Sequence, residues 1–110
     1  MSPEVEMTRR EFLEEALRQY PHNTFAHYGL ALELASSEPA ASWPHFEYLL
    51  QNHPEYSATY YQAGAFLMKQ GRMDEARKVL ATGVEVTGQQ GKQHARSELL
   101  AALEDLEERN

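Results

Sequence analysis

The sequence predicts an all-α fold in which about six helices form stacked antiparallel hairpins. A nine-residue pattern occurs three times, beginning at Leu13, Phe46 and Leu80, so successive copies start 33 and 34 residues apart. This period is typical of proteins in which one helical hairpin packs beside the next. Between the copies, apolar residues recur at the three- and four-residue spacing of a helix, and no segment alternates as a strand does.

The first two predicted helices cover residues 8–20 and 24–36. Thr8 has the position of a capping-box residue, Pro21 ends the first helix, and Asn23 can cap the second. The residues expected on the two packing faces are Phe12, Leu13, Ala16, Leu17, Tyr20, Phe25, Tyr28, Gly29, Leu32 and Ala35.

The middle two predicted helices cover residues 40–52 and 58–70, and Ser57 opens the second of them. Two helix starts stay open: Ser2, which precedes a proline, is also a good start for the first helix, and Ser42 offers a later start for the third. The residues expected to point inward are Trp43, Phe46, Leu49, Leu50, Tyr60, Ala63, Gly64 and Leu67.

The last two predicted helices cover residues 74–86 and 92–108. Gly71 lies in the turn before the fifth helix, and residues 87–91, which contain two glycines, are expected to form a loop after it. The residues expected on the packing faces are Ala76, Leu80, Gly83, Val84, Ala95, Leu99, Ala102, Leu103 and Leu106.

Composition narrows the class of function. The chain has no cysteine, so we expect neither disulfides nor a thiolate zinc site, and this suits a reducing, cytoplasmic location. The first residues do not resemble a secretory signal, and no stretch approaches the roughly 20 apolar residues of a membrane span. A formal charge of -7 repels phosphate backbones and anionic lipid surfaces, so we expect neither nucleic acid nor membrane as a partner.

Catalytic and metal-binding motifs are not recognised. Five histidines occur, at positions 22, 27, 45, 53 and 94, but no two of them are three or four residues apart on one predicted helix. Neither a glycine-rich phosphate loop nor a nucleophile elbow is found. We therefore expect no enzyme activity, no metal and no cofactor. The alternative, a small enzyme that uses His27 and Glu33, lacks a supporting motif and predicts bound metal in purified protein.

The residues of each repeat resemble the tetratricopeptide repeat, a helix-turn-helix unit of 34 residues. In the last full unit, Tyr60 takes the place of the family's tryptophan, Ala63 and Gly64 the place of its Leu-Gly pair, Gly71 that of its turn glycine, and Ala76 that of its alanine. Small residues at helix crossings let the helix axes approach each other closely. The sequence has six such small residues at the expected crossings, Gly29, Ala35, Ser42, Gly64, Ala76 and Gly83.

The resemblance implies a single domain over residues 1–110, built as a right-handed solenoid. Its parts would be a partial repeat over 8–21, two repeats over 22–56 and 57–90, and a C-terminal capping helix over 91–108.

The family's concave groove implies a candidate partner-binding surface. In the family, the first helices of successive units line this groove and bind extended or helical peptides. The positions that carry over are His27, Leu30, Leu34, Tyr61, Gln62, Ala65, Met68 and Lys69. Alternatively, the last helix covers these residues and makes them core. The sequence thus predicts a protein-interaction module for a protein or peptide, and the runner-up is a homodimer or other homo-oligomer that uses the same apolar patch.

Overall fold

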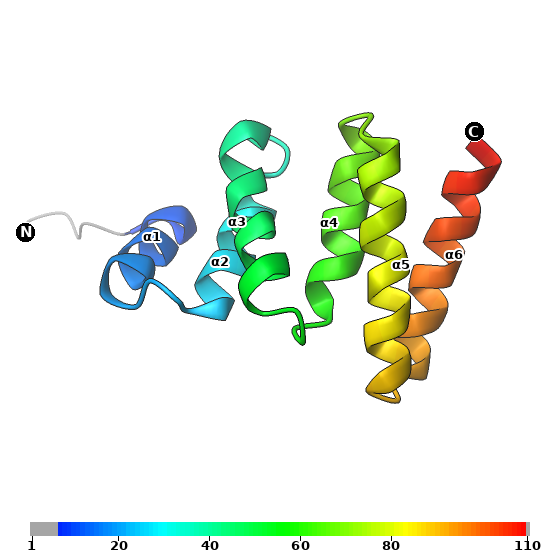
Figure 1. Ribbon diagram of the computed structural model, residues 1–110. Helices are drawn as coiled ribbons and strands as arrows, with labels where there is room; N and C mark the ends of the chain where they lie inside the picture. Colours follow the sequence, from blue (N-terminus) through cyan, green and yellow to red (C-terminus); the bar gives the residue numbers. More distant parts are fainter. Residues whose placement is uncertain (1–6, 110) are drawn as a thin grey trace, which may run out of the picture. The chain divides into compact units, whose positions relative to one another are not determined.

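The computed structural model describes residues 7–109, which form six α-helices and no β-strand (Figure 1). The all-α prediction is confirmed. The chain divides into two compact units, one ending at Leu49 and the other beginning at Leu50. The possible helix start at Ser2 lies outside the described residues, and the single domain with its repeat boundaries stays a prediction. None of the helices in residues 7–109 is long and apolar enough to cross a membrane.

The first unit contains α1 (Arg9–Gln19), α2 (Thr24–Leu34) and most of α3 (Pro39–Asn52). Both predicted caps are present. The Thr8 hydroxyl accepts a hydrogen bond from the Glu11 backbone N–H at 3.1 Å, and the Glu11 carboxylate accepts one from the Thr8 N–H at 2.9 Å. At the start of α2, the Asn23 side chain accepts a hydrogen bond from the Ala26 N–H at 2.9 Å. These bonds satisfy backbone donors that the first turns leave unpaired.

Close packing of α1 against α2 makes the core of the first unit. Leu13 is buried directly over Gly29, where an added Cβ would lie 2.9 Å from a Leu13 methyl carbon. Helix α3 is tied to α2 by the buried Ser42 hydroxyl, which donates to the Ala31 carbonyl oxygen at 2.7 Å. The core cluster consists of Leu13, Ala26, Leu30 and Leu34, with Ala16, Leu17 and Ala41 packed against it.

The predicted packing faces of α1 and α2 are partly wrong. Phe12, Tyr20 and Phe25 are exposed, and Leu32 is exposed as well. In α2 nearly every residue is apolar, so residue spacing alone does not determine which side packs inward. The side that packs inward carries Gly29, where Leu13 of α1 approaches the α2 backbone closely.

The second unit contains α4 (Ala58–Lys69), α5 (Met73–Gln89) and α6 (Gln93–Arg109), with α5 packed against both of the others (Figure 1). A Cβ at Gly64 would lie 2.4 Å from a Leu80 methyl carbon, and a Cβ at Gly83 would lie 2.5 Å from the Tyr60 Cβ. Glycine is required at both positions because the helices are in direct contact there. The predicted small residue Ala76 is fully buried in the same layer.

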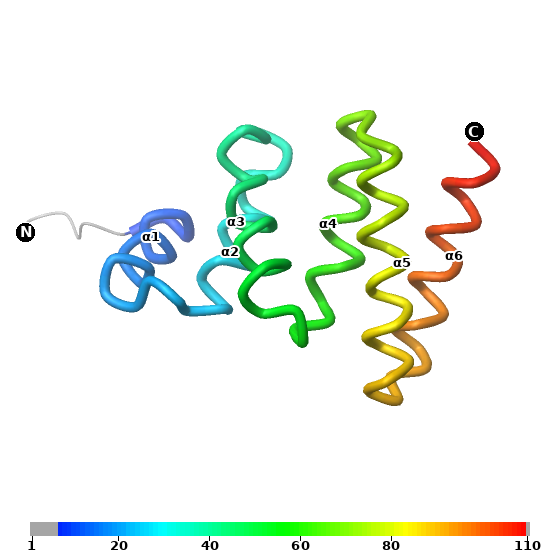
Figure 2. Tube along the Cα trace, in the orientation of Figure 1, coloured from blue at the N-terminus to red at the C-terminus, as the bar shows by residue number. Residues whose placement is uncertain are grey.

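Two turns of the same geometry join these helices (Figure 2). Gly71 and Gly91 have φ values of 76° and 72°, in the left-handed region that favours glycine. In each turn the next residue's N–H bonds back to a carbonyl five residues earlier, from Arg72 to Leu67 and from Lys92 to Thr87, both at 2.9 Å. This is the Schellman pattern of helix termination.

The predicted loop over residues 87–91 is wrong, because α5 continues to Gln89. Thr87 is buried, and its hydroxyl donates to the Gly83 carbonyl oxygen at 2.8 Å, which satisfies the polar group inside the helix. Gly88 does not end the helix, and the left-handed stop falls three residues later at Gly91.

Candidate partner-binding groove

A groove runs between α4 and α6 on the second unit, and we call it the α4–α6 groove. Four residues predicted from the sequence line its α4 side. Its volume is about 450 Å³. The complete lining is Tyr61, Ala65, Met68, Lys69, Glu98, Ala101, Ala102, Asp105 and Arg109.

Small side chains give the groove an apolar lining. Ala65 and Ala102 are half-buried and Ala101 is exposed, so the backbones of both helices are accessible between larger neighbours. Tyr61 is 44% exposed and carries a large apolar ring with a polar tip. Tyrosine is enriched among the residues that dominate binding energy in protein interfaces, and methionine side chains are flexible enough to fit surfaces of different shape.

Charges of both signs surround this apolar lining. Lys69 extends from the end of α4, while Glu98, Asp105 and Arg109 extend from α6. Arg109 and Asp105 form an ion pair at 3.2 Å, and Glu98 lies 3.6 Å from His94. All of these groups are solvent-exposed, so the ion pairs among them contribute little to the stability of the unit.

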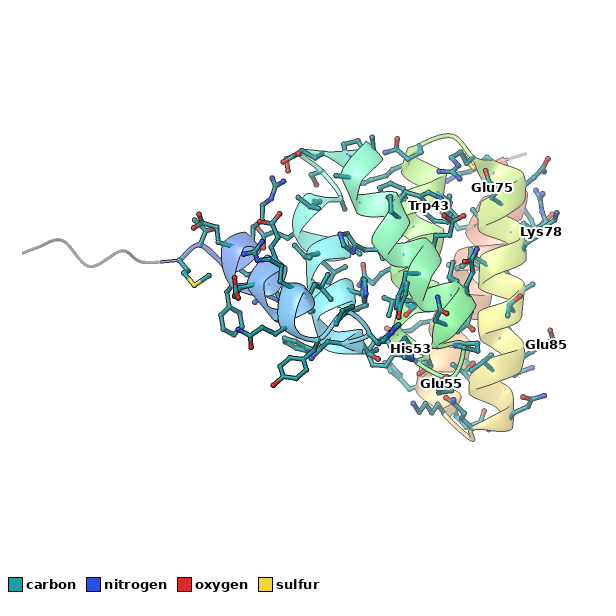
Figure 3. The ribbon with its side chains drawn as sticks, turned by 60° about the vertical axis from the view of Figure 1, so that its left-hand side comes forward. Trp43, His53, Glu55, Glu75, Lys78 and Glu85 are labelled. Atoms are coloured by element: carbon teal, nitrogen blue, oxygen red, sulfur yellow. The ribbon has the colours of Figure 1, made fainter. Side chains whose placement is uncertain are left out.

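The opposite side of α5 provides a contrasting surface. Figure 3 shows Glu75, Lys78 and Glu85 projecting from one side of this helix, and all three are exposed. The acidic residue Glu75 is paired with Arg72 at 2.7 Å, and this hydrogen bond lowers the pKa of its carboxyl group. This face is charged and carries ordinary surface residues, so it is a suitable place for control substitutions.

The other predicted site residues lie elsewhere. Leu30 and Leu34 are 1% and 4% exposed and belong to the core of the first unit, where Leu13 of α1 packs on the same cluster. They therefore do not contribute to an exposed apolar patch. Gln62 is half-buried on α4 and does not line the groove. Half of the predicted set is thus brought together at one groove. Leu30 and Leu34 are core residues of the first unit, in a cluster with Leu13 of α1.

His27 is also buried, and it joins a group of aromatic rings in the first unit. Its Nε2–H donates to the Pro21 carbonyl oxygen at 2.8 Å, and its Nδ1 is hydrogen-bonded to Nδ1 of His45 at 3.0 Å. The Tyr48 ring stacks on His27 with 4.0 Å between ring centroids, and its hydroxyl is hydrogen-bonded to His22. These contacts make His27 a structural residue of this unit.

The environment of this group changes the titration of one histidine. Burial lowers the pKa of His45, and the nearby His27 lowers it further, whereas Glu14 acts in the opposite direction. Among the described residues, no three histidine or acidic side chains lie together in a way that could hold a metal ion.

Sequence reasoning missed the α6 side of the groove. The sequence predicts a capping helix over residues 91–108 with Ala102 on its packing face, and this prediction names no groove residue on that helix. Ala101 and Ala102 are adjacent small residues on α6, and Ala65 is a small residue on α4 of the same unit. The presence of small residues on both helices is the signal that could have identified the two alanines of α6.

Helical hairpins joined by glycine turns, with small residues where helices cross, define a helical repeat protein. A sequence profile of the Tetratricopeptide repeat family matches residues 33–103. The chain belongs to this family, whose fold is generally a scaffold for protein interactions and typically non-enzymatic, and the family implies protein partners.

Solved structures with similar folds support the same assignment. The crystal structure of a tetratricopeptide repeat domain protein from Salinibacter ruber is 32% identical over 77% of this chain and 97% of that chain, with a TM-score of 0.72. A solution structure of a tetratricopeptide repeat domain protein from the same organism is 34% identical, covers 79% and 89%, and has a TM-score of 0.73. The solution structure of a protein from Bordetella parapertussis is 28% identical over 94% and 91%, with a TM-score of 0.80. A search of the curated proteins found no significant match.

Proposed function

We propose that this chain is a non-enzymatic protein-interaction module that binds a peptide or a partner helix in the α4–α6 groove. The single observation that carries the proposal is that Tyr61, Ala65, Met68 and Lys69 line this hollow together with alanines of α6. An accessible apolar lining with a charged rim is the usual character of a binding surface for an amphipathic segment.

Burial of apolar side chains would drive the binding. Contact with Tyr61 and Met68 contributes roughly 25 cal/mol per Å² of buried apolar area before the cost of ordering the partner is subtracted. The alanines let the partner's backbone approach closely, and the Lys69 and Arg109 cations and the Glu98 and Asp105 carboxylates fix its orientation. Affinity in the micromolar range is expected for a groove of this length.

The proposed partner is a protein and not nucleic acid or a membrane, because the net charge of -7 repels polyanions. The proposal keeps the cytoplasm as the expected location, and neither a metal nor a cofactor takes part in the binding. The second candidate is that the same groove holds another copy of this chain, since the exposed Tyr61 can anchor a contact with a second copy as well as one with a different protein.

The test begins with a random peptide library displayed on phage and selected against the purified protein. Binding of an enriched peptide is then measured by fluorescence anisotropy with a Tyr61→Ala/Met68→Ala variant and with a matched Lys78→Ala/Glu85→Ala variant of the outer α5 face. We expect the groove variant to lose at least tenfold in affinity with little change in melting temperature, and the control to bind normally.

Two results would count against the groove. Equal affinity of both variants would place the binding site elsewhere. A large fall in the melting temperature of the groove variant would show that Tyr61 and Met68 are core residues. Light scattering of the groove variant over a hundredfold range of concentration tests the second candidate, which predicts an oligomer that only this variant dissociates.

A further inference from the structure

A second apolar surface lies on α1 and α2 of the first unit, and it shares no lining residue with the α4–α6 groove. It is a hollow of about 500 Å³ with buried Leu13 and Ala26 in its lining. We call it the α1–α2 hollow, and its lining is Met7, Phe12, Leu13, Glu15, Ala16, Gln19, Tyr20, Asn23, Phe25 and Ala26.

Large apolar side chains gather around this hollow. Among the described residues, seven large apolar side chains are clearly exposed, and four of them line it, namely Met7, Phe12, Tyr20 and Phe25. Their exposed fractions are between 50% and 64%. Single exposed apolar residues are ordinary, but such a cluster marks an interface.

We propose that the α1–α2 hollow is a self-association surface that pairs with the same surface on a second copy of this chain. Its shape suits a two-fold contact, in which one patch has to be complementary to itself. The exposed rings of Phe12 and Phe25 project beside a hollow lined by Leu13, Ala16 and Ala26, so each copy offers both the projecting group and the space that receives it.

Charge favours a second copy at this place. The whole chain carries -7, so two copies repel each other in general, but α1 carries three arginines and three glutamates and is neutral. Glu15 is the one charged residue in the lining, and its carboxylate already accepts hydrogen bonds from Arg18 at 2.7 Å and Gln19 at 3.1 Å. Closing the interface therefore leaves no unpaired charge in the lining.

The available area predicts a weak dimer. An aromatic side chain presents 150–250 Å², so three rings exposed by about 60% and one half-exposed methionine supply on the order of 450 Å² per copy. Two copies bury about 900 Å² from these side chains, and the polar residues Gln19 and Asn23 of the lining bring the total to approximately 1,000 Å², the lower limit for a biological contact. We expect association that depends on concentration in the micromolar range.

Sedimentation velocity over a hundredfold range of concentration tests the proposal. We expect the unaltered chain to shift from monomer to dimer, and a Phe12→Gln/Phe25→Gln variant to remain monomeric throughout. Both side chains are largely exposed, so circular dichroism melting of this variant should match that of the unaltered protein. The Tyr61→Ala/Met68→Ala variant should dimerise normally, which separates this surface from the groove.

A second readout uses the absence of cysteine in the chain. A Gln19→Cys variant places one thiol in the hollow, and spin-labelling it should give dipolar broadening between copies at high concentration. A Lys78→Cys control on the outer α5 face should give none. A monomer at every concentration, or a dimer that persists in the Phe12→Gln/Phe25→Gln variant, would overturn the proposal. The first result would point to a different protein or an additional chain segment as the occupant of the hollow.

Discussion

The two apolar hollows differ in how they are built. The α1–α2 hollow is surrounded by three aromatic rings and a methionine, with one charged residue in its lining. The α4–α6 groove has one tyrosine, three alanines and four charged residues. A surface with large apolar side chains and little charge suits a contact that depends on shape, whereas small residues with charges of both signs suit a partner recognised by shape and electrostatics together. This difference leads us to assign self-association to the first and partner binding to the second.

The largest expected effect separates the core of the first unit from the exposed groove. Leu30→Ala should lower the free energy of unfolding by roughly 2 to 5 kcal/mol because it leaves a cavity beside Leu13 and Leu34. Tyr61→Ala should lower it by less than about 1 kcal/mol. Urea denaturation followed by circular dichroism measures both. Equal losses in unfolding free energy would contradict the placement of Leu30 in the core and of Tyr61 at the surface.

The next effect tests the helix contacts that support the groove. Gly64→Ala should cost roughly 1 to 3 kcal/mol of unfolding free energy, because its Cβ would meet Leu80 at 2.4 Å. Gly88→Ala is the matched control, since this exposed helical glycine has only the Arg96 side chain nearby at 3.3 Å. The control should be neutral or more stable by about 0.5 to 1 kcal/mol, since alanine favours the helix. If both changes behave alike, α4 and α5 are not in close contact at Gly64.

A smaller effect concerns the start of the helix that carries the α1–α2 hollow. Thr8→Ala removes the capping box of α1 and should cost about 1 kcal/mol, and it should weaken self-association because Phe12 lies in the next turn. Ser57→Ala at the start of α4 should cost much less, since Ser57 makes no capping hydrogen bond. Thermal melting and sedimentation of both variants check this. A larger loss for Ser57→Ala would reverse the expected order.

The smallest effect is a pH dependence confined to the first unit. Burial and His27 lower the pKa of His45 below its usual 6.5, so the unfolded chain binds this proton more tightly than the folded chain does. The contribution of His45 to the free energy of unfolding is therefore fully present above pH 6.5, and it is lost as the pH falls below that value. The loss should stay below about 1 kcal/mol because the ring is half-exposed. Melting from pH 8 to 5 should show a shallower decline for His45→Gln, and identical profiles would remove His45 as the cause.

Much of the fold could be predicted from the sequence because each helix has local signals of its own. The cap at Thr8, the cap at Asn23 and the turn glycine Gly71 act through neighbouring residues, so a linear sequence is enough to locate them. The end of α5 could not be located in this way. The burial of Thr87 decides it, and that depends on packing within the second unit.

The candidate site was predicted less well, and Leu30 and Tyr61 show why. The resemblance to the family predicts groove positions for both, yet Leu30 is core and Tyr61 is exposed. Which residue is covered depends on the neighbouring helix, and α1 packs on the α2 side that carries Leu30. For the same reason Phe12 and Phe25 were expected inside and are found outside. Leu13, which follows Phe12 in the chain, is the α1 residue that packs over Gly29 of α2.

The most direct test of these two roles compares two variants in the same two assays. Affinity for a selected peptide and sedimentation at high concentration are measured for Tyr61→Ala/Met68→Ala and for Phe12→Gln/Phe25→Gln. We predict that the first variant loses peptide binding and still dimerises, and that the second binds the peptide and stays monomeric. Loss of both properties in either variant, or of neither, would contradict the assignment of separate roles to the two hollows.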